Sequence, residues 1–141
     1  MSEDGHGAEL FELLRSMKLP TGHYAVFGSG PLLVRGIIES VNDLDVICRG
    51  PAWSRACELG PLVDLHQEEV QIVRTHDGAI TFGTSWGYGS FDLTELIDTA
   101  DLILNLPFVR LEHVIEYKRV ANRPKDQAHL DLIEQYLEAE N

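Results

Sequence analysis

The chain has 141 residues, of which 44% are hydrophobic and 24% charged. This composition is typical of a folded protein, and the length predicts a single domain over residues 1–141 that buries its own core. Acidic residues outnumber lysine and arginine by 23 to 11, and the net charge of −12 argues against a long DNA or RNA partner. No stretch approaches the roughly 20 apolar residues that cross a bilayer, and the acidic N-terminus lacks the features of a secretory signal. We therefore expect a cytoplasmic protein with no membrane partner.

The first third of the chain predicts one helix, two strands and a short second helix. Apolar residues at i, i+3, i+4 and i+7 predict an amphipathic helix over residues 8–17. Beyond it the pattern predicts a buried strand over 23–27, a glycine-rich turn over 28–31, a short helix over 32–35 and a second strand over 44–48. Pro31 suits the first turn of that short helix.

The remainder predicts more strands and then helices. The expected elements are a helix from Pro51 to Gly60, strands over 62–65, 70–75 and 79–82, a hairpin turn at 76–78, a loop over 84–90, a helix over 92–99, an apolar and partly extended segment over 102–109, and helices over 111–121 and 124–138. Pro107 limits its segment to a sheet edge or a strand end, and Asn122 suits the N-cap of the last helix. We therefore expect an α+β fold with a small mixed sheet flanked by helices.

The cysteines and histidines do not indicate a metal or redox site. Cys48 and Cys57 are nine positions apart, which fits neither a Cys-x-x-Cys motif nor a dense disulfide framework. We expect both cysteines to be reduced and buried. The six histidines form no zinc-binding pattern.

The segment 24–46 contains the residues that best indicate chemistry. A glycine-rich turn, Gly28-Ser29-Gly30, follows a buried strand and leads directly into a helix. Backbone N–H groups in such a turn form an anion site, to which Ser29 adds a hydroxyl donor. Asp43 and Asp45 are two positions apart at the next strand, so both side chains face the same side of the sheet. Two neighbouring carboxylates repel unless a cation joins them, and Mg²⁺ is the natural choice.

A Gly-Ser turn after a strand, a short helix and then Asp-x-Asp resembles the nucleotidyltransferase superfamily of the polymerase-beta type. The stretch from Glu116-Tyr117-Lys118 to Asp131-Leu132 is similar to the tail of small bacterial members. These include aminoglycoside and lincosamide nucleotidyltransferase-like proteins and toxin-type nucleotidyltransferases. The similarity spans residues 20–138 and implies a nucleotidyltransferase-like fold.

The resemblance implies a Mg²⁺-dependent enzyme that moves a nucleoside monophosphate from an NTP to a hydroxyl of a small molecule or protein. The turn Gly28–Gly30 would hold the nucleotide phosphates, Asp43 and Asp45 would ligate Mg²⁺, and Lys118 would face the phosphates or the carboxylates as a catalytic residue. We also expect Arg35 near the nucleotide; the simpler alternatives are a solvated helix residue or a partner of Asp43. The acceptor and the base preference have no signal in the sequence.

One departure from the family pattern motivates a second hypothesis. Active members usually add a third carboxylate from a later strand, but the strand predicted over 79–82 has Thr81 at that place. Asp92 and Glu69 are the nearest substitutes along the chain. The alternative is a catalytically reduced binding or interaction module, as in a toxin–antitoxin-like pair, for which a protein partner or a homodimer stays open.

Several of these residues also have a purely structural interpretation. Lys118 falls on the apolar stripe of its helix, which indicates either a lysine that covers the edge of the core or one paired with a buried carboxylate. The charges at 123–126 suit a helix-start cluster with an ion pair of little net energy. Trp86 and Tyr88, in the glycine-rich loop, either stack on a base or pack locally.

Overall fold

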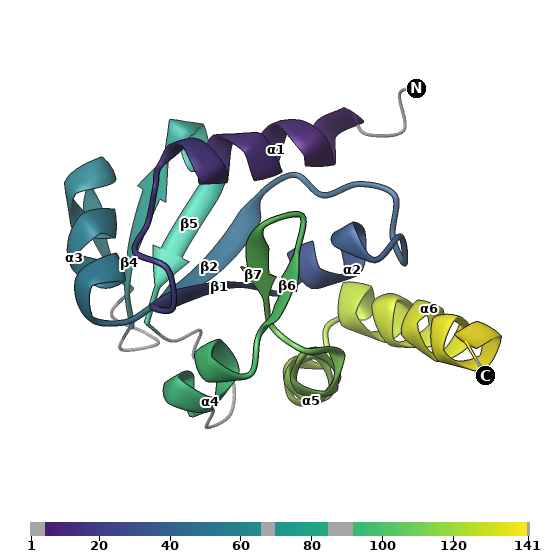
Figure 1. Ribbon diagram of the computed structural model, residues 1–141. Coiled ribbons are helices and arrows are strands. Elements are labelled where there is room, and N and C mark those ends of the chain that lie inside the picture. The colour runs from purple at the N-terminus through teal and green to yellow at the C-terminus, as the bar shows by residue number, and fades with distance from the viewer. Residues whose placement is uncertain (1–4, 66–69, 85–91, 141) are drawn as a thin grey trace.

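The computed structural model describes residues 5–65, 70–84 and 92–140, and Figure 1 shows their arrangement around one central sheet. The helices are α1 (Gly5–Ser16), α2 (Gly30–Val34), α3 (Gly50–Leu59), η2 (His76–Gly78), α4 (Leu93–Asp98), α5 (Leu111–Ala121) and α6 (Pro124–Glu140). The strands are β1 (Tyr24–Phe27), β2 (Leu44–Cys48), β3 (Leu62–Leu65), β4 (Val70–Thr75), β5 (Ile80–Gly83), β6 (Asp101–Ile103) and β7 (Leu106–Phe108). None of the helices in these ranges has the length and apolar character needed to cross a membrane.

The seven strands form one mixed sheet with the order β3-β4-β5-β2-β1-β7-β6. The β1–β7 and β2–β5 pairs are parallel, whereas the other neighbouring strands are antiparallel. The expected α+β class with a mixed sheet flanked by helices is therefore confirmed. The strand predictions over 44–48, 62–65 and 70–75 coincide with β2, β3 and β4.

One face of the sheet packs against α1 and α3. Val26, Val46, Phe82 and Val73 are in register across four adjacent strands, so their side chains project from the same face. All four belong to a buried cluster that includes apolar residues of both helices. Burial of this continuous apolar surface is the main favourable contribution to the stability of the fold.

The opposite face packs against α4, α5 and the first half of α6. Phe27 and Ile47 lie on this face and share a second buried cluster with Val114, Tyr117 and Ile133. The ring of Phe27 lies 4.7 Å from that of Tyr117, centroid to centroid. Figure 1 shows α1 on one side of the sheet and α4 and α5 on the other, with α6 continuing past the end of α5. The second face carries the candidate site.

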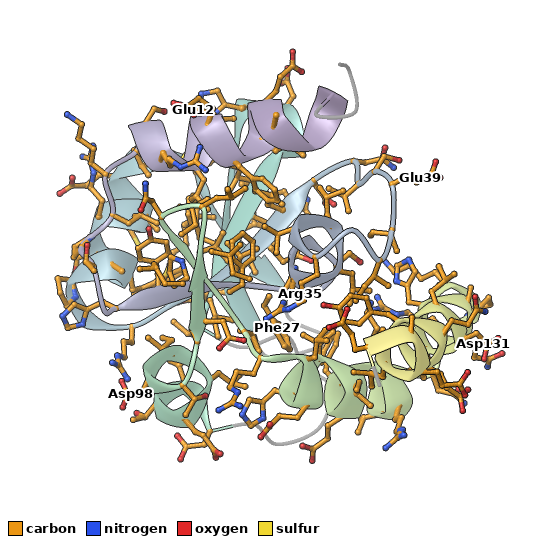
Figure 2. The ribbon with its side chains drawn as sticks, turned by 45° about the vertical axis from the view of Figure 1, so that its right-hand side comes forward. Glu12, Phe27, Arg35, Glu39, Asp98 and Asp131 are labelled. Atoms are coloured by element: carbon orange, nitrogen blue, oxygen red, sulfur yellow. The ribbon has the colours of Figure 1, made fainter. Side chains whose placement is uncertain are left out.

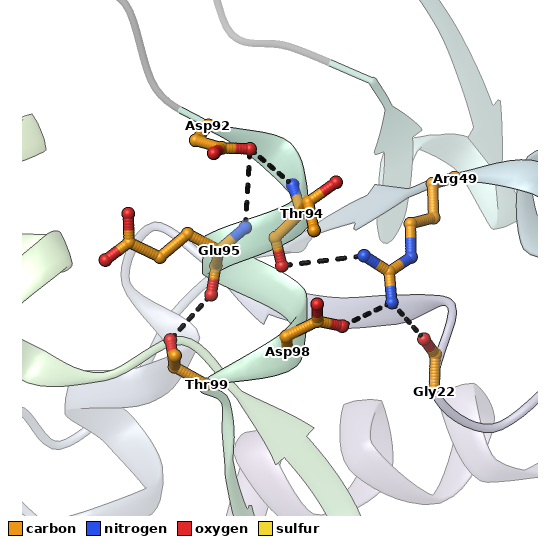
Figure 3. A network of polar contacts seen from close by, with 7 residues as sticks. All are labelled: Gly22, Arg49, Asp92, Thr94, Glu95, Asp98 and Thr99. Carbon is orange, nitrogen blue, oxygen red and sulfur yellow. Dashed lines mark hydrogen bonds and ion pairs between the residues drawn. The ribbon is translucent and has the colours of Figure 1, made fainter.

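A polar network attaches α4 to the backbone that precedes β1 (Figure 3). The guanidinium of Arg49 donates to the carbonyl of Gly22 at 2.8 Å and forms an ion pair with Asp98 at 2.5 Å. At the start of the same helix, Asp92 accepts the N–H groups of Thr94 at 3.0 Å and Glu95 at 3.4 Å. Asp92 is therefore an N-cap, a structural role that accounts for its position at the start of α4.

The segment 102–109 differs from expectation because it contains two strands. Leu104 and Asn105 have positive φ angles of 53° and 65°, and they connect β6 to β7 as a tight hairpin. Pro107 is the middle residue of β7, which lies between β1 and β6, so the expectation of a sheet edge or a strand end is wrong. The proline is tolerated because β1 pairs with β7 at Val26 and Phe108, one residue further along.

Two smaller expectations are also wrong. Asn122 is the left-handed C-cap of α5, with φ 49°, and its N–H donates to the carbonyl of Lys118; it does not cap α6. Asparagine suits this position because it adopts positive φ more readily than most residues. Cys48 is buried as expected, and burial raises the pKa of its thiol to about 12, but Cys57 is exposed.

Candidate functional site

The glycine-rich turn lies at the end of β1, as the sequence predicts. Gly28 has a φ of +68°, which glycine adopts without the steric cost that a side chain would add. Ser29 occupies the N-cap position of α2 but makes no capping hydrogen bond with its side chain. The hydroxyl of Ser29 is thus not committed to the helix that it precedes.

The turn leaves no room for a side chain between Gly28 and Asp45. Phe27, the last residue of β1, pairs with Asp45 across the antiparallel ladder, which brings the following residue, Gly28, over the carboxylate. A Cβ atom built at Gly28 would lie 3.0 Å from Oδ2 of Asp45. The structure therefore brings together the two motifs that lie 17 positions apart in the sequence.

Asp45 is a carboxylate in an unfavourable environment. It is half-buried on β2, whereas Asp43, just before the strand, is exposed. Burial, and then the charge of Asp43, raise the pKa of Asp45 to about 6, and this rise is opposed by Lys125, Arg123 and Lys118. A cation close to such a carboxyl group favours its charged form and lowers its pKa again.

The cations near Asp45 come from the junction of α5 and α6. Lys118 is 1% exposed and its Nζ lies 3.4 Å from Oδ1 of Asp126, which is fully buried. Arg123 donates to Asp126 three times, from its backbone N–H at 3.0 Å, from Nε at 2.6 Å and from a terminal nitrogen at 3.1 Å. Of the two alternatives for Lys118, the pairing with a buried carboxylate is the one observed.

The partners of Asp126 and Lys118 at this junction favour the charged form of each side chain. Burial raises the pKa of Asp126, but hydrogen bonds from Arg123 and the charge of Lys118 outweigh it and bring the pKa to about 2. Burial lowers the pKa of Lys118, and Asp126 opposes that change. The cluster expected at 123–126 is therefore present at the start of α6, but its carboxylate is fully buried. Loss of one partner would leave an uncompensated buried charge, whatever the net energy of the intact pair.

Arg35 has a partner that the sequence did not indicate. Its guanidinium forms an ion pair with Asp101 of β6 at 2.7 Å and donates to the carbonyl of Pro31 at 3.0 Å. The side chain of Arg35 is 10% exposed, so it is neither a solvated residue nor a partner of Asp43. A phosphate contact by Arg35 stays a prediction, and it requires the guanidinium to leave Asp101 or to bind both.

Thr81 occupies the place next to Asp45 where a third carboxylate was sought. β2 and β5 are parallel and Asp45 pairs with Thr81, so the two side chains share a face of the sheet. Over residues 5–65, 70–84 and 92–140, no three His, Cys, Asp or Glu side chains gather in a way that would hold a metal. Glu69, like Trp86 and Tyr88, lies outside the described residues.

One further side chain of this region was not singled out by the sequence. His129, on α6, has a buried Nδ1 that finds no hydrogen-bond partner among the residues that the structure describes. Burial and the nearby charges of Lys118 and Lys125 lower the pKa of the imidazole. Its position three residues after Asp126, on the helix that begins beside the buried ion pair, is the signal that would have pointed to it.

Comparisons with known proteins add no family to this geometry. No protein-family model, curated protein or solved structure matches this chain. Membership of the nucleotidyltransferase superfamily therefore stays a prediction, and the function must be argued from the site.

Proposed function

We propose that the chain is a Mg²⁺-dependent nucleotidyltransferase-like protein that uses the Gly28–Gly30 turn and the Asp43/Asp45 pair to bind an NTP. The observation that supports this most is the close approach of the turn to Asp45, since a Cβ atom at Gly28 would lie 3.0 Å from Oδ2 of that carboxylate. An anion-binding turn adjoining two carboxylates is the pairing that a metal–triphosphate complex needs. On this proposal the fold is nucleotidyltransferase-like and the setting is cytoplasmic, where NTP and Mg²⁺ are supplied.

The two carboxylates suit a Mg²⁺ ion that binds together with the NTP. Asp43 and Asp45 offer oxygen ligands, and Mg²⁺ commonly binds one or two carboxylates while phosphates and water complete its octahedron. The raised pKa of Asp45 fits as well, since a cation would favour the charged form. When bound, Mg²⁺ would stabilise charge on the leaving pyrophosphate and favour the deprotonated acceptor hydroxyl.

The chain's own residues divide the remaining tasks. Backbone N–H groups of Gly28, Ser29 and Gly30 hold the phosphates, and the uncommitted Ser29 hydroxyl adds a donor. Lys118 is buried against Asp126, so we propose that it acts as a positioning residue rather than as a group that touches the nucleotide. Its charge, with those of Arg123 and Lys125, offsets the negative charge of Asp45.

A binding module with little or no turnover is the second candidate. It is favoured by Thr81, which pairs with Asp45 where active members of the superfamily carry a third carboxylate. Without that group, the described residues place no third carboxylate in a cluster with Asp43 and Asp45 that could help to deprotonate an acceptor hydroxyl. In this case the site binds a nucleotide and a partner protein or a second copy supplies the function.

A thermal-shift panel tests the binding proposal. Purified protein is scanned with ATP, GTP, CTP and UTP, each with and without Mg²⁺, because a ligand that binds only the folded state raises its Tm. We expect at least one NTP to raise Tm only with Mg²⁺, and Asp45→Asn to abolish the rise. Glu12→Gln is the control, since Glu12 lies on α1, which covers the other face of the sheet (Figure 2).

Mg²⁺-dependent release of pyrophosphate from the bound NTP separates the two candidates. Release that is lost in Asp45→Asn supports the transferase. Binding without release supports the binding module. No Mg²⁺-dependent binding of any NTP by the wild-type chain would contradict both.

A further inference from the structure

A groove lies between α5 and α6. Its floor is apolar and consists of Ile115 from α5 with Leu130, Ile133 and Leu137 from α6, and its volume is about 360 Å³. Only Ile133 of these is fully buried, and Leu137 is 41% exposed. The apolar stripe of α6 is therefore only partly covered by the chain itself.

The rim of this groove is acidic. Asp131, Glu134 and Glu138 line it together with one cation, Arg119. Asp131 lies on the outer side of α6, away from the sheet (Figure 2). The groove therefore combines an apolar floor with an excess of carboxylates, on a chain whose overall charge is −12.

The second half of α6 also lacks internal support. The helix continues past α5 toward the C-terminus (Figure 1), and its buried residues are Asp126 and Ile133. Its last turn has no basic residue, although the carbonyl end of a helix favours cations and disfavours carboxylates. A helix of this length gains most of its stability from a packed apolar face. A partner that brings apolar side chains and positive charge would supply both.

The same charges argue against other occupants. Phosphate backbones and anionic lipid surfaces would be repelled by the carboxylates at the rim. A second copy that packed with the same face would place Asp131, Glu134 and Glu138 opposite their own counterparts. An amphipathic helix laid into a groove between two helices is, in contrast, a common mode of peptide recognition.

We propose that the α5–α6 groove docks an amphipathic helix of a partner protein that carries lysine or arginine on both sides of its apolar stripe. The apolar stripe fills the floor around Ile133 and Leu137, and the cations pair with Glu134 and Glu138 at the rim. This surface is separate from the Gly28–Asp45 corner, and the inference does not depend on the proposed nucleotide binding.

Two designed helical peptides test the proposal on the full chain. Both carry leucine at i, i+3, i+4 and i+7, and the flanking positions are lysine in one and glutamate in the other. We expect saturable binding of the lysine peptide, at least about tenfold tighter than that of the glutamate peptide and weakened by salt. Fluorescence anisotropy measures the affinities, and amide chemical shifts locate the contact on α5 and α6.

Variants of the chain test whether the peptide binds at this groove. Leu137→Asp should weaken the lysine peptide by about tenfold or more, and Glu134→Gln with Glu138→Gln should weaken it and reduce its salt dependence. Leu102→Asp is the control, since Leu102 is 71% exposed on β6. Equal binding of the two peptides, indifference to Leu137→Asp or no saturable binding would overturn the proposal. So would a homodimer in sedimentation that Leu137→Asp dissociates, because the occupant would then be a second copy.

Discussion

Gly28 combines two constraints that can be separated by experiment. Its φ of +68° disfavours any side chain, and a Cβ would lie 3.0 Å from Oδ2 of Asp45. Gly36 has a similar φ of +78°, but a Cβ there would meet nothing within 4 Å. We expect Gly28→Ala and Gly36→Ala to cost a similar free energy of unfolding, about 1–2 kcal/mol, because the positive φ dominates and a carboxylate can turn aside. Urea denaturation measures both costs.

The two glycine variants should differ at the site. In Gly28→Ala the new methyl group displaces the carboxylate of Asp45, so Mg²⁺-dependent nucleotide binding should weaken, whereas Gly36→Ala should bind as the wild type does. The pKa of Asp45, followed by carboxyl ¹³C chemical shifts, should also change in Gly28→Ala alone. If both variants leave that pKa and the binding unchanged, the contact between Gly28 and Asp45 has no role in the site.

Asp45 makes the stability of the metal-free protein depend on pH. Burial, together with Asp43, raises its pKa from the ordinary value of 3.8 to about 6, so the fold favours the neutral carboxyl. The stability that this preference contributes is fully present below about pH 4 and is lost as the pH rises through about 6. Asp45→Asn should therefore match the wild type near pH 4 and be more stable by up to about 3 kcal/mol at pH 7 and above.

Urea denaturation at a series of pH values, in the presence of EDTA, tests this dependence. Glu12→Gln, on the other face of the sheet, should show no comparable crossover. A constant difference between Asp45→Asn and the wild type from pH 4 to pH 8 would show that Asp45 is not penalised for its charge.

The junction of α5 and α6 depends on one carboxylate more than on either of its cations. Asp126 accepts three hydrogen bonds from Arg123 and one from Lys118, at 3.4 Å. Asp126→Asn leaves two cations near each other without a countercharge and should cost about 3–5 kcal/mol. Lys118→Met keeps Asp126 paired with Arg123 and preserves the apolar stem, so its cost should be closer to about 1 kcal/mol. Chemical denaturation of the two variants measures this asymmetry.

A double-mutant cycle completes the comparison. When Lys118→Met and Asp126→Asn are combined, the loss should be smaller than the sum of the single losses, because one stranded cation is removed. Equal costs for the two single variants, or strict additivity, would contradict the central role of Asp126.

Helix and strand boundaries followed from local patterns wherever the pattern was complete. The apolar period of α5 and the strands β2, β3 and β4 were predicted with their observed bounds. The β6–β7 hairpin was missed because Leu104 and Asn105 have positive φ without the Asn-Gly or Asp-Gly signal that usually marks such a turn. Asn122 was placed at the start of α6 because asparagine suits both a helix N-cap and a left-handed C-cap, and only the geometry decides between them.

At the site, too, some features could be predicted from the sequence and others depend on the tertiary arrangement. The Gly28 turn and Asp45 were predicted to form one corner, and the pairing of Phe27 with Asp45 brings them together; Thr81 was predicted at the place of the third carboxylate, and it pairs with Asp45. The pairing of Arg35 with Asp101 was not, since the two lie 66 positions apart and only the tertiary arrangement of α2 and β6 joins them. The burial of Asp126 was missed for a related reason: a charged residue is rarely fully buried, so its partners must be seen first.

Because Thr81 is uncharged, Asp45 has no second carboxylate beside it on β5. One pair of variants tests what this means for metal binding. Thr81→Asp adds a third carboxylate beside Asp45, at a position that is 8% exposed. Without metal, like-charge repulsion and burial should destabilise the protein by about 2–4 kcal/mol. Mg²⁺ should restore much of that loss, because three carboxylates bind it more tightly than two and binding to the folded state raises Tm. Thr81→Asn is the matched control, since it has nearly the same shape but adds no charge.

The response to Mg²⁺ in these variants bears on both proposed functions. A larger Mg²⁺-dependent rise in Tm for Thr81→Asp than for Thr81→Asn would locate the metal on the face shared by Asp45 and Thr81. If the added carboxylate also creates or increases pyrophosphate release, the wild-type chain is limited by the group that Thr81 replaces, as the binding-module hypothesis requires. A Mg²⁺ response that is the same in both variants would show that residue 81 does not reach the metal, and Thr81 would then no longer favour the binding module over the transferase.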